Sequence, residues 1–311
     1  MGTLYGARVL VTGGAGAIGS HLAAKLIARG ATVYVIDNLT SGREQDVPRG
    51  ASMFALDIRD PELESFFSAG LDAVFHLAAR FANQNSIDHA EDDLAVNAGG
   101  TLRLLELAKR FGVRRFVYAS TSCVTQLRTP YAISKMAGEQ YALFYGEQHA
   151  LPVSVVRYYN SYGPHDYPGP YRSVVPNFLW SAMHGRPLTI KGSGLETRDF
   201  TFVEDAVEGT IRCAERPAAV GRVFPLGAGR PVSILHLAEC VNALTGNPAG
   251  VEVQPRRDWD TVTNRKADIA LAQELLDYHP STDLVDGLSR THAWLQSLSP
   301  DAVCSGAIAS T

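Results

Sequence analysis

The chain has 311 residues, of which 46% are hydrophobic and 19% are charged, and its formal net charge is −4. This composition is ordinary for a soluble globular enzyme that buries a full core, and the weak negative charge argues against nucleic acid or an acidic membrane as a partner. The first residues lack the charged-then-apolar pattern of a signal peptide, and no apolar run is long enough to cross a bilayer.

The four cysteines lie far apart in the sequence, and none belongs to a Cys-x-x-Cys pair. They are Cys123, Cys213, Cys240 and Cys304. This spacing favours a reduced, cytoplasmic setting and argues against a disulfide framework or a structural zinc, so we expect no metal site.

The first half of the chain alternates short apolar runs with helical patterns. The expected strands are Arg8–Thr12, Thr32–Ile36, Ser52–Leu56, Ala73–Leu77, Arg115–Ala119 and Val153–Tyr158. The clearest helix is Thr101–Phe111, which carries Leu102, Leu105 and Ala108 on one face. Strands buried on both sides and alternating with helices predict an α/β fold, a Rossmann-type doubly wound parallel sheet over residues 1–165 that leaves room for elements from the second half.

After Tyr162 the sequence becomes rich in Gly, Pro and Tyr, and the elements beyond it are short and mixed. The expected elements are helices near Val174–His184, Asp205–Glu215, Ile234–Leu244 and Leu284–Leu295 and a strand at Asp199–Val203. We expect residues 166–296 to form a smaller α/β substrate-binding lobe over the carboxyl edge of the sheet, where ligands bind in open α/β folds. Residues 297–311 are small and polar, and we expect a disordered tail.

A glycine-rich turn joins the first strand to the first helix. Gly14, Gly16 and Gly19 fit the pattern G-x-G-x-x-G, and Gly13 gives the alternative frame G-x-x-G-x-x-G. Glycines here let a pyrophosphate approach bare backbone amides at a helix N-terminus. The expected cofactor contacts in this turn are Gly13, Gly16, Ala17, Ile18 and Gly19.

Asp37 follows the second strand, at about the 20-residue spacing expected of the acid that binds the adenosine ribose. Its carboxylate would accept from both ribose hydroxyls and repel a 2′-phosphate, and Asn38 and Leu39 supply no arginine for that phosphate, so NAD is favoured over NADP. The alternative is a glycine-rich turn followed by a surface aspartate.

Two further segments fit the same cofactor. Asp57 and Ile58 follow the third strand and could reach the adenine, although a lone aspartate there is more often a helix cap. Leu77, Ala78 and Ala79 end the fourth strand, where small residues let the cofactor lie close to the backbone. A buried core turn is the equal alternative for these three residues.

Tyr131 and Lys135 are spaced to share one face of a helix. A lysine this close favours the phenolate and is expected to lower the tyrosine pKa, so that Tyr131 can take a proton from a sugar hydroxyl while hydride leaves for NAD. The hydroxyls of Thr121 and Ser122, at the end of the preceding strand, would bind the substrate oxygen. The alternative for the pair is a solvated helix face.

Taken together, these motifs resemble the extended short-chain dehydrogenase/reductase family, in its nucleotide-sugar epimerase/dehydratase branch and near the UDP-glucose 4-epimerases. The resemblance covers about residues 7–296. The segments that carry it are Thr12–Gly19, Asp37-Asn38, His76–Ala79, Asn97 with Gly100-Thr101, Tyr118–Thr121, Tyr131 with Lys135, Arg157–Pro164, Val175–Phe178, Arg198–Phe200 and Arg257–Asp260.

The resemblance implies a role for each matching residue. Tyr131 would be the general base and acid, Thr121 would bond the sugar O4, and Lys135 would tune Tyr131 and bind the cofactor ribose near Asn97. The implied nucleotide-sugar contacts are Asn160 and Arg198 for the diphosphate, Val175, Asn177 and Phe178 for the nucleotide, and Arg257 and Asp260 for the phosphate and the uridine ribose. The alternatives are an ion pair of Arg198 with Asp199 or Glu196, and a surface pair of Arg257 with Asp260.

Members of the branch share oxidation of the sugar at C4. In the dehydratases of this branch, Asp-Glu follows the catalytic threonine directly, and decarboxylases usually keep the Glu at the second of these positions. In this chain the two positions hold Ser122 and Cys123. The expected function is therefore an NAD-dependent 4-epimerase acting on a UDP-hexose, with the cofactor recycled. The alternatives are a UDP-glucuronate 4-epimerase or decarboxylase, a dehydratase, a 4-ketoreductase and, outside enzymes, an NAD-sensing regulator. Cys123 could serve as a weak acid or base, but an inert buried thiol is favoured.

Three further expectations concern the surroundings of the site. The loop 125–130 is shorter than the family pattern, which bears on the identity of the sugar. Arg80 or Arg172 could pair with a carboxylate at C6 of the sugar, although either is more often a surface residue. A homodimer is expected from the resemblance, through the helices Thr101–Phe111 and Tyr131–His149.

Overall fold

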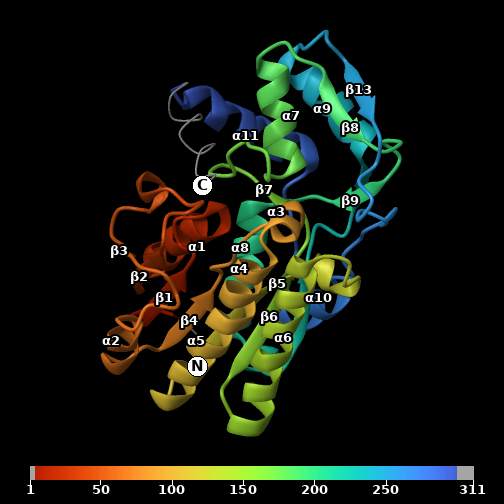
Figure 1. Cartoon of the computed structure of the whole chain (residues 1–311). Helices are drawn as coiled ribbons and strands as arrows, with labels where there is room; N and C mark the ends of the chain where they lie inside the picture. The colour runs from red at the N-terminus through yellow and green to blue at the C-terminus, as the bar shows by residue number, and fades with distance from the viewer. Residues whose placement is uncertain (1–3, 300–311) are drawn as a thin grey trace.

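The structure, a computed structural model, describes residues 4–299. Its centre is a seven-stranded parallel sheet in the order β11-β6-β5-β4-β1-β2-β3, which is the doubly wound α/β arrangement that the sequence predicts (Figure 1). The strands are β1 (Arg8–Thr12), β2 (Thr32–Asp37), β3 (Ser52–Ala55), β4 (Ala73–His76), β5 (Arg115–Thr121), β6 (Val153–Tyr158), β7 (Ser161–Tyr162), β8 (Leu188–Lys191), β9 (Thr197–Asp199), β10 (Thr201–Phe202), β11 (Val223–Leu226), β12 (Pro231–Ser233) and β13 (Val251–Gln254).

Helices cover the sheet and connect its strands. They are α1 (Ala17–Ala28), α2 (Leu63–Ser68), α3 (Asn83–Asp88), α4 (Ala90–Leu94), α5 (Thr101–Arg110), α6 (Pro130–His149), α7 (Val174–Met183), α8 (Val203–Glu215), α9 (Ile234–Thr245), α10 (Ala270–Leu276) and α11 (Leu284–Ser297). Short helical turns are η1 (Glu44–Asp46), η2 (Ala95–Gly100, a π-helix), η3 (Ser122–Thr125) and η4 (Pro217–Ala219).

The sheet is buried on both faces, and the alternation of side chains along β1 shows how. Val9 and Val11 point into a hydrophobic cluster with α1 and α8, whereas Leu10 points into a second cluster with α5 and α6. β11 and α8 come from the second half of the chain, so the sheet and its covering layer draw on residues far beyond 165.

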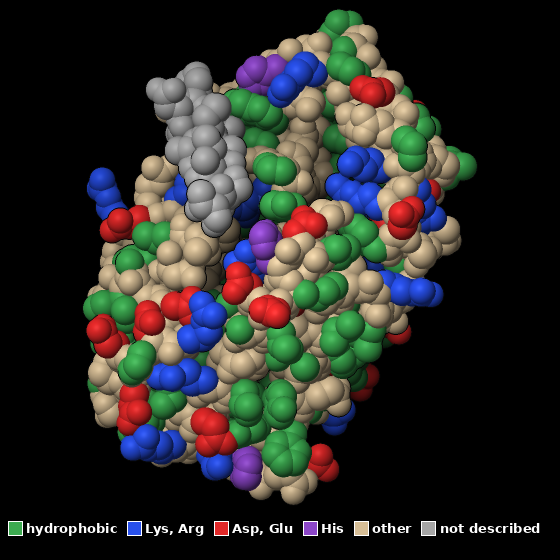
Figure 2. Space-filling view, viewed as in Figure 1, with side chains coloured by type: hydrophobic (Ala, Val, Ile, Leu, Met, Phe, Trp, Pro, Cys, Tyr) green, Lys and Arg blue, Asp and Glu red, His purple; other side chains and the backbone are tan. Residues whose placement is uncertain are grey.

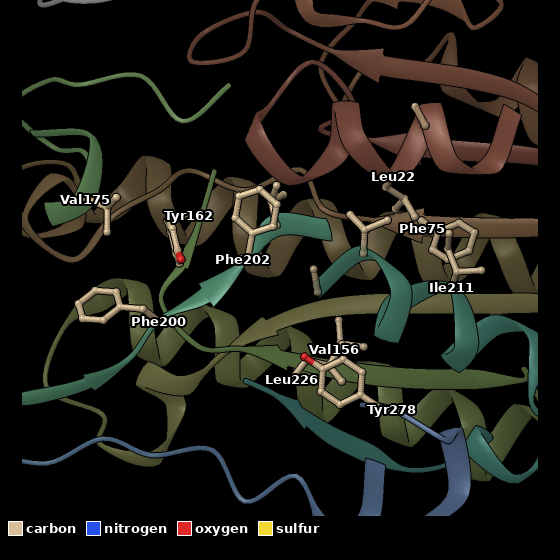
Figure 3. Packing of buried hydrophobic residues seen from close by; sticks show 14 of the residues in the cluster. Leu22, Phe75, Val156, Tyr162, Val175, Phe200, Phe202, Ile211, Leu226 and Tyr278 are labelled. Atoms are coloured by element: carbon tan, nitrogen blue, oxygen red, sulfur yellow. The ribbon is translucent and has the colours of Figure 1, made fainter. Parts of the chain in front are cut away.

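A small lobe, made of α7, α9 and α11 with the parallel pair β8–β13, sits above one edge of the sheet (Figure 1). Its core is continuous with the first cluster: Figure 3 shows the cluster running from Leu22 on α1 and Phe75 on β4 to Phe200 and to Val175 on α7. The two parts therefore share buried surface, and the cavity between them has walls from both.

The predicted strand at 199–203 is wrong in detail. β9 ends at Asp199 and pairs with β12, whereas β10 begins at Thr201 and pairs with β7. The chain changes partners because the Asp199 carboxylate accepts from the backbone amides of Ala228, Gly229 and Ala267, at 2.7 to 3.0 Å, which fixes it away from the next strand. α8 accordingly begins earlier than predicted.

The predicted disordered tail begins too early, because α11 continues through Ser297. Residues 300–311 lie outside the described residues. Within residues 4–299 no helix has the length and apolar character needed to span a membrane. The cytoplasmic location expected from the cysteines stays a prediction.

Candidate active site

A cavity of about 1260 Å³ lies between the carboxyl ends of the sheet strands and the small lobe. Figure 2 shows Lys and Arg side chains gathered beside a hollow under that lobe. All the site residues predicted from the sequence line this cavity except Asn97 and Val175. They are Gly13, Gly16, Ala17, Ile18, Gly19, Asp37, Asn38, Asp57, Ile58, Leu77, Ala78, Ala79, Thr121, Ser122, Tyr131, Lys135, Asn160, Asn177, Phe178, Arg198, Arg257 and Asp260.

The glycine turn forms one end of the cavity, and its geometry selects the frame G-x-x-G-x-x-G. A Cβ on Gly13 would lie 2.6 Å from the backbone nitrogen of Ala78, and one on Gly19 would lie 2.1 Å from the carbonyl oxygen of Gly13. Gly14 instead faces Val35 and does not line the cavity. Because α1 starts at Ala17, its free amides open onto the cavity, as a dinucleotide pyrophosphate requires.

Asp37 stands beside this turn at the end of β2. Its carboxylate accepts from the backbone amides of Ala15 and Leu39, at 3.0 and 2.9 Å, and burial raises its pKa above the usual value. Asp57 is held differently, because the Arg59 guanidinium donates to it at 2.8 and 3.1 Å and keeps its pKa low. Asp37 therefore has the position expected of an acid that binds the adenosine ribose. The Asp57 carboxylate is instead largely engaged by hydrogen bonds from Arg59.

The reactive pair lies at the start of α6. Thr129 caps this helix by accepting from the amide of Ala132 at 3.3 Å, and Pro130 opens it, so that Tyr131 and Lys135 face the cavity together. Tyr131 is 8% exposed and Lys135 is 2% exposed. The Thr121 hydroxyl, at the end of β5, lies close enough to the phenol of Tyr131 to favour its charged form.

Burial dominates the ionisation of this pair. It raises the pKa of Tyr131 well above the ordinary value, with the Cys123 thiol adding to the effect and the Thr121 hydrogen bond opposing it. It also lowers the pKa of Lys135 to about 7, against the pull of the Asp93 and Glu139 carboxylates. The tyrosine pKa is therefore raised in this structure, and not lowered as the spacing of Tyr131 and Lys135 predicted, because desolvation of the phenolate dominates.

Asn97 is fully buried in the π-helix and does not line the cavity. Its side chain accepts from the amide of Arg80 at 2.8 Å and donates to the carbonyl of Arg80 at 3.1 Å. It also donates to Asp93, which accepts from Ser134 next to the reactive lysine. Asn97 therefore holds the loop after β4 against α6 from behind the cavity wall. The direct cofactor contact that the resemblance implied is not possible from this position, because Asn97 does not line the cavity.

The nucleotide end is built by the second half of the chain. The amide oxygen of Asn160 is buried and has no partner, which leaves it open to a ligand. Asn177 instead ties the loop 169–172 to α7, accepting from the amide of Gly169 at 2.9 Å. Val175 does not line the cavity, because it points into the core beside Tyr162 (Figure 3).

Arg198 and Asp260 form an ion pair at the cavity wall. Both carboxylate oxygens of Asp260 accept from one guanidinium nitrogen, at 3.0 and 3.1 Å. Arg198 therefore does not form the ion pair with Asp199 or Glu196 that was one alternative. The alternative pair of Arg257 with Asp260 is also not formed, because Asp260 pairs with Arg198. The guanidinium of Arg257 lies 5.5 Å from the centre of the Trp259 ring.

Arg265 also lines the cavity, although no sequence motif marks it as a site residue. Its Nη1 lies 3.5 Å from the Sγ of Cys123, which is 142 positions away in the chain. Asn83, at the start of α3, also reaches this thiol, at 3.6 Å. No motif in the sequence marks either contact, because each joins η3 to a segment that lies far from it in the chain: α3 for Asn83 and the residues beside β9 for Arg265.

Comparison with known proteins gives a consistent result. Residues 9–227 match the model of the NAD-dependent epimerase/dehydratase family. A UDP-N-acetyl-alpha-D-glucosaminuronate decarboxylase of Bacillus cytotoxicus is 32% identical over 94% of this chain and 99% of its own. The fold is similar to that of an epimerase of Methanothermobacter thermautotrophicus, with a TM-score of 0.92 and 43% identity over 94% of this chain and 93% of that one. A UDP-glucose 4-epimerase of Thermotoga maritima, solved with UDP-glucose, gives a TM-score of 0.89 and 32% identity, covering 93% of this chain and 98% of that one.

Proposed function

The chain belongs to the NAD-dependent epimerase/dehydratase family, and on that premise we propose that it is a 4-epimerase of a UDP-hexose. The cofactor expected from the sequence, NAD, is the one that defines the family. The observation that carries the proposal is the buried phenol of Tyr131, which lines the same cavity as the Thr121 hydroxyl, the glycine turn and Asp37.

The residues of the cavity fit NAD. The amides around Gly13, Gly16 and Gly19 would hold the pyrophosphate, Asp37 the adenosine ribose and Lys135 the nicotinamide ribose. Bound NAD supplies a hydride acceptor and then a hydride donor, so that C4 of the sugar is oxidised and reduced again, and its positive charge offsets the burial of a phenolate.

Tyr131 is proposed to move the proton at O4. Its phenolate accepts the proton of the O4 hydroxyl while Thr121 donates a hydrogen bond to the same oxygen, and the charged form of Lys135 stabilises the anion. Once the 4-keto sugar has turned in the cavity, Tyr131 returns the proton to O4.

The second half of the chain is proposed to hold the nucleotide. Arg198 and Arg257 offer guanidinium groups to the diphosphate, and Asp260 offers a carboxylate to the ribose. The buried, unpartnered amide oxygen of Asn160 fits a donor on the ligand. Phe178 lines the cavity as an apolar surface for the base.

Epimerisation is favoured over elimination because Ser122 and Cys123 follow Thr121, so that no carboxylate stands there to move protons at C5 or C6. Decarboxylation is the second candidate, since the Bacillus cytotoxicus relative is named for it. Oxidation of a hexuronate at C4 gives a β-keto acid, which can lose carbon dioxide without any further protein group.

The experiment is a substrate panel read by NMR. UDP-glucose, UDP-N-acetylglucosamine and UDP-glucuronate are incubated separately with the holoprotein, and the proposal expects one of them to equilibrate with its C4 epimer. A 4-keto-6-deoxy product would reject epimerisation, and release of carbon dioxide from UDP-glucuronate would replace it with the second candidate.

We also propose a homodimer formed through α5 and α6. Ile133, Tyr141 and Phe144 are spaced to share one face of α6, and all three are more than 40% exposed. An apolar face of this kind favours association with a second copy. Sedimentation of the wild type against Phe144→Glu tests it: a charged residue should yield monomers.

A further inference from the structure

Building on the proposed function, we propose that Arg265 binds a carboxylate at C6 of the sugar, so that the preferred substrate is a nucleotide-linked hexuronate. Arg265 is anchored by its backbone amide, which donates to the carbonyl of Thr197 at 3.1 Å beside β9. From there its side chain crosses to Cys123 in η3, the turn that follows Thr121. The guanidinium therefore stands at the end of the cavity where the reaction takes place.

The hydrogen-bonding capacity of Arg265 is largely unused. A guanidinium carries five N–H donors, but the side-chain contact of Arg265 is to a thiol, which is a weak acceptor. Within residues 4–299 no carboxylate forms an ion pair with it, whereas Arg80 pairs with Asp92 at 3.4 Å and Arg198 pairs with Asp260. A half-buried cation with open donors in a ligand cavity favours an anionic partner.

A second donor converges on the same place. The side-chain nitrogen of Asn83 also points at the Cys123 thiol, at 3.6 Å, and its amide oxygen is fixed by the Thr129 hydroxyl at 2.7 Å. An oxygen atom that enters beside this thiol would accept from both Arg265 and Asn83. Two fixed donors, one of them a cation with no ion-pair partner among residues 4–299, suit a carboxylate better than a neutral hydroxymethyl group, which would meet the same donors without a charge.

The position matches C6 and not the diphosphate. Cys123 lies in η3, two positions after Thr121, and lines the same cavity as Tyr131, so Arg265 stands at the end of the cavity that holds the group that takes the O4 proton. C6 hangs from C5, the neighbour of C4, whereas the diphosphate hangs from C1 on the far side of the ring. The two other arginines considered for a C6 carboxylate are less suited, because Arg80 is paired and Arg172 donates to the carbonyl of Ser41 at 2.9 Å.

The test separates binding from turnover. Dissociation constants of UDP-glucuronate, UDP-glucose and UDP are measured by calorimetry on the NAD-loaded protein in a Tyr131→Phe background, which stops the reaction. The variants are Arg265→Met, Arg265→Lys and, as a matched control, Arg222→Met, an exposed arginine outside the cavity. We expect UDP-glucuronate to bind about tenfold more tightly than UDP-glucose.

Arg265→Met should abolish that preference without changing the affinity for UDP, Arg265→Lys should retain part of it, and Arg222→Met should retain all of it. Equal binding of the two sugars to the unsubstituted site would overturn the inference. So would an equal loss of UDP affinity in Arg265→Met, because Arg265 would then serve the diphosphate. If UDP-glucose alone is epimerised by the wild type, the inference fails and the proposed function stands. If an Arg265-dependent preference appears but no C4 epimer forms, the site stands and the proposed function fails.

Discussion

The hydroxyl of Thr121, the last residue of β5, lies close enough to the phenol of Tyr131, at the start of α6, to favour the phenolate. A strand end and a helix start, joined by the short turn η3, thus bring an alcohol and a phenol to one point in the cavity. A sugar hydroxyl that enters there meets a proton acceptor and a hydrogen-bond donor together.

Removing the phenol oxygen should remove turnover and leave binding. Tyr131→Phe keeps the ring, which packs edge-on against Phe81 with centroids 6.1 Å apart, but loses the group that takes the O4 proton. We expect turnover to fall by about 10²- to 10⁴-fold with NAD content unchanged. Tyr141→Phe, on the same helix but 42% exposed, is the matched control and should keep full activity. Comparable losses in both variants would contradict the assignment.

A methyl group in the glycine turn should expel the cofactor. In Gly19→Ala the new Cβ would stand 2.1 Å from the Gly13 carbonyl oxygen, so the turn must open and its amides must leave the pyrophosphate. The purified variant should contain little NAD by extraction and assay. Gly146→Ala in α6, whose Cβ would meet its nearest neighbour at 3.5 Å, is the control. Normal NAD content in Gly19→Ala would refute the placement of the pyrophosphate.

Local sequence was enough to predict much of the fold. β1 and β6 have the predicted bounds because each is built around neighbouring buried valines and leucines, as strands covered on both faces require. The strand expected at 199–203 failed because its partners, β12 and β7, lie elsewhere in the chain and pull its halves apart. Strand pairing of this kind is tertiary information that periodicity does not hold.

The candidate site divides in the same way. The glycine turn and the spacing of Tyr131 and Lys135 are local, and the structure brings them to one cavity as expected. Val175 was misplaced because it lies two positions from Asn177 on α7, so the two point in different directions. The contacts Arg198–Asp260 and Arg265–Cys123 join residues 62 and 142 positions apart, and no sequence pattern connects them.

The choice of cofactor should depend on Asp37. Its carboxylate is held by two backbone amides at the cavity wall, where a 2′-phosphate would meet its charge. Asp37→Ser should weaken NAD binding and reduce the discrimination against NADP by about tenfold or more. Titration of the cofactor-free protein with both dinucleotides measures the ratio, and Asp72→Ser, outside the cavity, is the control. An unchanged ratio in Asp37→Ser would place the adenosine ribose elsewhere.

Asp166 should make stability depend on pH. Burial raises its pKa from 3.8 to about 6, and the Ser173 hydroxyl and Arg172 oppose this only in part. The pKa of Asp166 is higher in the folded state than in the unfolded state. The protonated carboxyl therefore stabilises the fold below about pH 4, and this stabilisation is lost as pH rises to about 6. Asp166→Asn removes this ionisation. The free energy of unfolding of the variant, relative to that of the wild type, should therefore rise by about 2 kcal/mol as pH rises between these limits. Urea unfolding at both pH values gives the difference, and a constant difference would contradict it.

The most direct test of the central claim follows a hydrogen isotope at C4. The best substrate of the panel is prepared with deuterium at C4, and the holoprotein is allowed to equilibrate it with its epimer in ordinary water. If Tyr131 moves only the O4 proton while hydride leaves C4 and returns to it, the epimer should retain its deuterium, as NMR would show. An epimer that carries hydrogen from solvent at C4, or inversion without any reduced cofactor, would contradict the account.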